Sequence, residues 1–141
     1  AAFVDFLTDG QNRLVWGAMT ALNTIARAFP ERVFPHLAPV MAATDRGSVI
    51  TKDHGLGVLI GLCLVEGFRQ ATFPLLLEQL RTCPAKQVPL YAERCLVLIP
   101  VINTLELARA LAHRFDELEK ESQRKRLKKV LVKLGAPAPA G

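Results

Sequence analysis

Residues 50–80 have the sequence ITKDHGLGVLIGLCLVEGFRQATFPLLLEQL, which predicts two consecutive helices. The first half carries apolar residues three and four positions apart: Leu56, Leu59, Ile60, Cys63 and Leu64. The second half repeats this spacing with Phe73, Leu76, Leu77 and Leu80. Such spacing places the apolar side chains of each helix on one face, whereas a strand would need strict alternation.

The same pattern occurs before and after this segment. Residues 12–43 and residues 88–115 each contain an apolar helical pattern, a break and a second helical pattern. The dipeptide Phe34-Pro35 returns as Phe73-Pro74, 39 residues later, a distance that fits the period of two-helix repeats. The sequence therefore predicts an all-α chain, a right-handed α-solenoid of about three helix pairs with a C-terminal capping helix.

Prolines indicate where these helices begin, end or bend. Helices are expected to start or stop at Pro30, Pro84 and Pro89, because proline interrupts the hydrogen-bond ladder of a helix. Kinks are expected at Pro35, Pro39, Pro74 and Pro100, which fall inside helical patterns. The first helix of the third pair is expected to continue through Ile102.

One repeat domain is predicted over residues 1–134, followed by a disordered tail over residues 135–141. Residues 1–8 look like the second helix of a preceding unit, so the domain is expected either to be a fragment of a longer chain or to begin with an irregular N-terminal cap. The chain is expected to turn near residues 119–123. A short amphipathic helix then closes the stack with an apolar stripe of Leu127, Val130, Leu131 and Leu134.

Residues 7–22, LTDGQNRLVWGAMTAL, contain a loop aspartate, an arginine four positions later and an Ala…Leu helix. In this arrangement the chain resembles the HEAT/armadillo family of helical repeats. The resemblance implies that Asp9 and Arg13 belong to a ladder of side chains that ties neighbouring repeats together. Asp45 occupies the equivalent loop position in the next unit.

No motif of a metal or catalytic site is recognisable. His36, His54 and His113 have no metal-binding spacing and belong to no His-Glu pair. The cluster of Gly55, Gly57 and Gly61 lacks the ending of a phosphate-binding loop, so we expect it to let two helices approach closely. The sequence thus predicts no metal, no cofactor, no catalytic residue and no enzymatic activity. A HEAT-like enzyme subunit is kept as a third hypothesis.

Two features bear on the location of the protein. Cys63, Cys83 and Cys95 are an odd set without paired spacing, so we expect free thiols and a reducing, cytoplasmic environment. The most apolar run, Gly55 to Val65, has 11 residues, whereas a membrane-spanning helix needs about 20. No membrane span is predicted.

Charged side chains on the second helices of the pairs are the candidate contacts for a protein partner, because these helices line the concave face of a solenoid. The candidates are Arg32, His36, Arg69, Glu78, Arg81, Arg109 and Arg114. A second candidate surface is the helix start formed by Lys52, Asp53 and His54, since binding groups favour loops on a rigid scaffold.

The positive charge of the chain lies in its last helix. The net charge is +5, yet residues 122–141 hold six basic residues and no acidic one, and the rest holds twelve basic and thirteen acidic residues. The six are Arg124, Lys125, Arg126, Lys128, Lys129 and Lys133. We expect them to solvate the outer face of the cap, with nucleic acid, an acidic protein or a membrane surface as alternative ligands.

These observations favour a non-catalytic scaffold for protein–protein interaction. The alternative is nucleic-acid binding through the basic last helix, in the manner of HEAT-like DNA repair proteins. The nearly neutral remainder of the chain disfavours that alternative, because phosphate contacts supply most of the affinity for nucleic acid.

Overall fold

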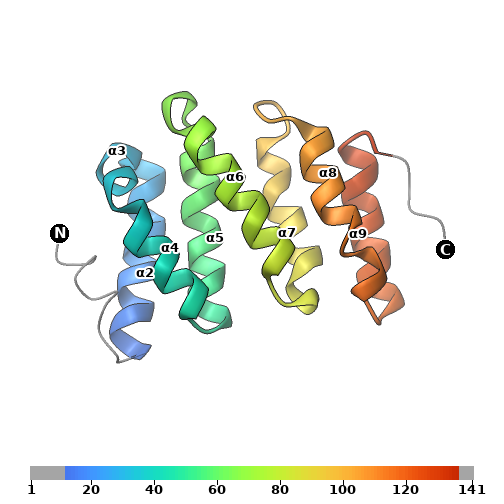
Figure 1. Cartoon of the computed structure of the whole chain (residues 1–141), viewed down its shortest axis with the longest axis horizontal. Helices are drawn as coiled ribbons and strands as arrows, with labels where there is room; N and C mark the ends of the chain where they lie inside the picture. Colours follow the sequence, from blue (N-terminus) through green and yellow to red (C-terminus); the bar gives the residue numbers. More distant parts are fainter. Residues whose placement is uncertain (1–11, 137–141) are drawn as a thin grey trace. The chain divides into compact units, whose positions relative to one another are not determined.

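The computed structural model describes residues 12–136, with side chains from Gly17 onward. Over these residues the chain forms helices and turns and no strand, which confirms the prediction of an all-α protein (Figure 1). The helices fall into two compact units that divide between Phe73 and Pro74. None of the described helices is both long and apolar enough to cross a lipid bilayer.

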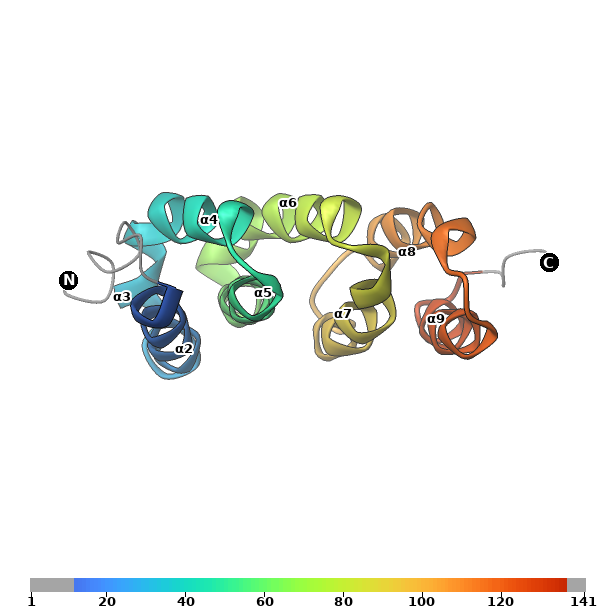
Figure 2. The same ribbon diagram turned by 90° about the horizontal axis from the view of Figure 1, so that it is seen from below.

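The first unit contains three long helices and the start of a fourth. The helices are α2 (Asn12–Ala28), the short α3 (Pro30–Val33), α4 (Leu37–Arg46), α5 (Val49–Cys63) and the first half of α6 (Glu66–Thr82). A 3-10 turn, Phe34–His36, joins α3 to α4. Within this unit α2 and α5 lie side by side, and α4 lies across α5 in a second layer (Figure 2).

The second unit begins in the middle of α6. A 3-10 turn (Ala85–Gln87) leads to α7 (Val88–Arg94), which continues as a 3-10 segment, Cys95–Leu98. Helix α8 (Thr104–Ala112), the 3-10 turn Phe115–Glu117 and α9 (Glu121–Lys133) complete the unit. Helix α9 packs against both α7 and α8.

Helix α5 forms the centre of the first unit, and two of its glycines allow the close packing predicted for them. All residues from Gly55 to Cys63 are buried. A Cβ atom on Gly55 would lie 2.6 Å from Cγ2 of Thr44 in α4, and one on Gly57 would lie 2.5 Å from Nδ2 of Asn23 in α2. Since real Cβ atoms do not approach other heavy atoms so closely, a side chain at position 55 would displace Thr44, and one at position 57 would require the side chain of Asn23 to move.

Side-chain caps define two helix starts. Ser48 accepts a hydrogen bond from the amide of Thr51 at the start of α5. Asn103 accepts hydrogen bonds from the amides of Leu105 and Glu106, at 3.0 and 3.2 Å, at the start of α8. Caps of this kind satisfy amides that have no partner inside the helix.

The prolines differ partly from prediction. As predicted, Pro30 and Pro89 lie in the first turns of α3 and α7, and Pro84 directly precedes a 3-10 turn. The predicted kinks at Pro35, Pro39 and Pro100 are wrong. Pro35 lies in the 3-10 turn, Pro39 in the first turn of α4 and Pro100 in the turn before α8, where no interior helix bond is lost. Of these four prolines, Pro74 alone lies in a helix interior.

The third pair also differs in length from prediction. The helix expected to continue through Ile102 ends at Arg94, and the 3-10 segment ends at Leu98. The last helix agrees with the sequence pattern, because Leu127, Val130, Leu131 and Leu134 are all buried. The predictions for residues 1–8, Asp9, the side chain of Arg13 and the tail beyond residue 136 lie outside the described residues.

Candidate functional site

Basic side chains close the carboxyl ends of successive helices. In the first unit, Nζ of Lys52 donates to the carbonyl oxygens of Thr44 and Asp45, each at 3.0 Å, in the last turn of α4. At the end of α5, Nε of Arg69 donates to the carbonyl oxygen of Cys63 at 2.8 Å. The last carbonyl groups of a helix lack intrahelical partners and carry partial negative charge, so a cation stabilises them.

In the second unit, Arg114 has this role for α6. Its two terminal nitrogens donate to the carbonyl oxygens of Leu80 and Cys83, at 2.9 and 2.7 Å, and Nε donates to the carboxylate of Glu117. Arg114 is 8% exposed and is the one charged side chain among the described residues that is buried. Its charge is compensated by hydrogen bonds on all sides, as a buried charge requires.

A fourth basic side chain, that of Arg124, also donates to a main-chain oxygen. Nε of Arg124, in the first turns of α9, donates to the carbonyl oxygen of Leu118 at 2.8 Å. Its guanidinium also lies 5.9 Å from the centre of the Phe115 ring. Arg124 thus holds the segment between the 3-10 turn and α9.

These contacts correct the predicted partner surface. Arg114 was expected to contact a partner but is buried, and its donors are used within the chain. Arg69 is half-buried and bound to the end of α5. Sequence reasoning missed this structural role, because the acceptors are main-chain oxygens that every residue possesses.

The predicted helix-start surface also differs. Lys52, Asp53 and His54 are each half-buried. The imidazole of His54 lies against α2, with Nε2 3.1 Å from Oγ1 of Thr20 and Nδ1 3.3 Å from Nδ2 of Asn23. His54 therefore joins α5 to α2.

The other predicted contacts are more exposed. In the first unit, Arg32 is exposed with its guanidinium 5.2 Å from the centre of the Phe29 ring, and His36 is half-buried. In the second unit, Glu78 and Arg81 form an exposed ion pair on α6 at 3.8 Å, and Arg109 is exposed on α8. Among these five residues, Glu78 and Arg81 are the pair that the structure brings into direct contact.

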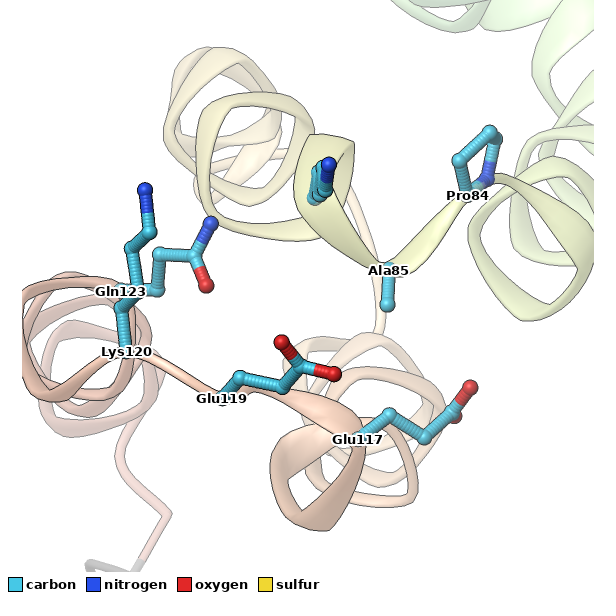
Figure 3. Close-up of a pocket in the computed structure, with 7 residues that line it drawn as sticks. Pro84, Ala85, Glu117, Glu119, Lys120 and Gln123 are labelled. Atoms are coloured by element: carbon cyan, nitrogen blue, oxygen red, sulfur yellow. The ribbon is translucent and has the colours of Figure 1, made fainter.

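A cavity of about 420 Å³, lined mainly by polar and charged residues, lies in the second unit. Its walls come from the segment before α7 and the segment that leads into α9 (Figure 3). Lys86 and Lys120 balance Glu117 and Glu119 in charge, and Glu117 already binds Arg114. Among the described residues no three His, Cys, Asp or Glu side chains gather as metal ligands would.

The exposed sides of α7 and α9 form a surface of mixed character, which we call the α7–α9 surface. The two helices lie side by side in one layer of the second unit (Figure 2). Apolar side chains are prominent on it, with Leu90 40%, Val97 50% and Val132 61% exposed. The charged members are Glu93, Lys125, Arg126, Lys129 and Lys133.

An ion pair joins the two halves of the α7–α9 surface. Nη2 of Arg126 lies 2.5 Å and Nε 3.1 Å from the two carboxylate oxygens of Glu93. The hydrogen bond from Arg126 lowers the pKa of Glu93, with smaller contributions from the charges of Arg126, Lys133 and Lys129. The carboxylate thus lies in a positive field produced by α9.

Comparison with known proteins identifies no family. No family model matches the chain, and no curated protein or solved structure shows significant similarity to it. The HEAT/armadillo resemblance accordingly stays a prediction, and function has to be inferred from the surfaces of the helices.

Proposed function

We propose that the chain is a HEAT-like helical repeat module, a right-handed α-solenoid with a capping C-terminal helix, that serves as a non-catalytic protein-binding scaffold. Three buried free thiols suit a reducing compartment such as the cytoplasm. A protein is the proposed partner, bound through exposed side chains of the packed helices.

The observation that carries this proposal is the α7–α9 surface. Leu90 and Val97 are seven residues apart, so both lie on the exposed side of α7 and its 3-10 extension. Glu93 lies three residues after Leu90 and four before Val97, on the same side of the helix, and it pairs with Arg126 of α9. Protein interfaces commonly combine an apolar centre with a polar rim, and burial of exposed apolar area drives association.

The buried polar groups support the same proposal. Arg114 binds main-chain oxygens, His54 binds α2, and the hydroxyl of Thr44 donates to the carbonyl oxygen of Val40 at 2.8 Å. Each of these groups contributes to helix packing or to helix ends. The exposed helix faces are available to contact another molecule.

The test uses Leu90→Ser/Val97→Ser, with Leu105→Ser as the matched control. Leu105 is 55% exposed at the start of α8, outside the α7–α9 surface. Proteins captured from a lysate by the wild-type chain are purified, and their direct binding is measured by titration calorimetry. We expect the double variant to weaken binding by about tenfold or more and the control by less than about twofold.

The proposal fails if no captured protein binds the purified chain directly, or if the control weakens binding as much as the double variant. Capture that disappears after nuclease treatment would favour the alternative, nucleic-acid binding through the basic residues of α9.

A further inference from the structure

The basic residues of α9 are not equivalent. Arg126 is paired with Glu93, and Arg124 is bound to the carbonyl oxygen of Leu118. Nζ of Lys128 lies 5.6 Å from the centre of the Phe115 ring. By contrast, Lys125, Lys129 and Lys133 are exposed and make no hydrogen bond or ion pair with the described residues.

These three lysines form a stripe along the outer face of α9. They are four residues apart, so successive side chains lie one above another on the helix. The opposite face is buried through Leu127, Val130 and Leu131. Because one helix side carries the whole stripe, the charges act together on a ligand that lies along it.

An apolar depression lies beside this stripe. It is lined by Val132, which is 61% exposed, and by the carbon chains of Lys128, Lys129 and Lys133. An exposed valine among lysines has no role in solvating the helix. It offers an apolar contact between positive charges.

We propose that this face of α9 binds an acidic segment of a protein partner, in which carboxylates meet Lys125, Lys129 and Lys133 and an apolar side chain covers Val132. This inference rests on the proposed function and names the chemistry of the partner. Carboxylates complement the stripe, and an aliphatic side chain complements the depression.

Nucleic acid fits this face less well. Helix α9 contains no aromatic residue on which a base could stack, and stacking supplies much of the affinity for single strands. A phosphate backbone would also bury Val132 without giving it an apolar contact. A peptide satisfies both the charges and the valine.

The experiment measures fluorescence anisotropy of labelled probes with the full chain. The first probe is an acidic peptide of roughly 14 residues in which leucine recurs every third or fourth position among Glu and Asp. The second has serine in place of each leucine, and the third is a single-stranded thymidine oligonucleotide of similar charge. The stripe variant is Lys129→Glu/Lys133→Glu. Its matched control, Lys86→Glu/Arg109→Glu, changes the net charge equally at exposed positions of the same unit.

We expect the stripe variant to weaken binding of the leucine peptide by about tenfold or more and the control by less than about twofold. Val132→Ser should weaken the leucine peptide by about threefold and leave the serine peptide unchanged. This single replacement keeps the test decisive should the double variant fold poorly, which circular dichroism would reveal.

The inference would be overturned if the stripe variant and its control lost the same affinity for the leucine peptide. It would also be overturned if the wild-type chain bound the leucine and serine peptides equally tightly, or bound the oligonucleotide more tightly than the leucine peptide. If the leucine peptide does not bind, yet a captured protein still requires Leu90 and Val97, the scaffold proposal stands and this inference falls.

Discussion

The guanidinium of Arg114 donates to the main-chain oxygen of Cys83, 2.7 Å away. The same side chain reaches the carbonyl oxygen of Leu80 and the carboxylate of Glu117. One residue that follows α8 thus closes the end of α6, in the same unit, through a charge removed from solvent.

Replacing Arg114 should therefore destabilise the protein strongly. Arg114→Met leaves two helix-end carbonyl groups and the Glu117 carboxylate without their donor, and we expect a loss of about 3 kcal/mol in the free energy of unfolding. Urea unfolding followed by circular dichroism measures it. Arg109→Met, an exposed arginine on α8, should change the free energy by less than about 0.5 kcal/mol. Similar losses for the two variants would contradict the structural role of Arg114.

Replacing three glycines of the first unit by alanine should change the stability of the protein to different degrees. Gly55→Ala should cost about 2 kcal/mol, because the new methyl group would also lie 2.9 Å from Cβ of Thr44, which cannot move without its backbone. Gly57→Ala should cost less, since the side chain of Asn23 can rotate away at the expense of its contact with His54. Gly17→Ala should instead stabilise α2 by up to about 1 kcal/mol, because no atom of the described residues outside the adjoining helix backbone lies within 4 Å of the new Cβ. Thermal unfolding of the three variants gives the order, and a destabilised Gly17→Ala would show that α2 is packed differently.

The thiol of Cys63 should resist alkylation in the native protein. Burial raises its pKa to about 12, only partly opposed by the charge of Arg69. At pH 8 roughly one such thiol in ten thousand is ionised, and the thiolate is the reactive form. Iodoacetamide labelling resolved by peptide mass spectrometry should show Cys63 unmodified until denaturant is added. Ser122→Cys places an exposed thiol on α9 as a control, and comparable labelling rates at both positions would refute the burial of Cys63.

The ion pair between Glu93 and Arg126 should give a small stability difference that depends on pH. Because the folded-state pKa of Glu93 is lowered from 4.5, the pair stabilises the native state fully above that pH. Its contribution is lost as the pH falls through the lowered value. Unfolding of wild type and Glu93→Gln should therefore differ near neutrality, by at most about 1 kcal/mol for an exposed pair, and converge in acid. In an Arg126→Gln background the same substitution should show a weaker pH dependence, since only the smaller contributions of Lys133 and Lys129 still lower the pKa of Glu93.

The helical periodicity was informative because it is a local property of the sequence. The apolar spacing predicted the buried face of α9 and most of that of α5, as the burial of Leu127 and Leu59 shows. Leu64 is the exception, since α5 ends at Cys63 and Leu64 is 37% exposed beyond it.

The spacing of apolar residues did not predict where the first helix of the third pair ends. Apolar residues continue from Cys95 to Ile102 with only Pro100 among them, so the spacing alone predicted a helix that is too long. The signal that could have corrected it is Asn103 followed three residues later by Glu106, a pattern typical of a helix start. In the structure Asn103 caps the start of α8, and the 3-10 segment ends before it at Leu98.

The candidate site was predicted least well. Charge pattern identifies which side chains are cationic but does not say which of them find an acceptor within the chain. Arg69 and Arg114 were candidates for partner contact and Lys52 for a separate surface at a helix start, and all three donate to carbonyl oxygens at helix ends. The apolar members of the α7–α9 surface were missed, because Leu90 and Val97 resemble core residues until the packing of α7 is known.

The closing of helix ends by basic side chains has a consequence for how the sequence can diverge. A carbonyl oxygen is present whatever side chain its residue carries, so the contact of Arg114 with residue 80 places no demand on the identity of that residue, whereas at position 83 the Sγ atom of the cysteine also accepts from Arg114. We expect related sequences to retain a cation at positions 52, 69 and 114 while the accepting positions other than 83 vary independently. Methods that detect contacts through correlated substitution would then pass over the interactions that hold these helix ends.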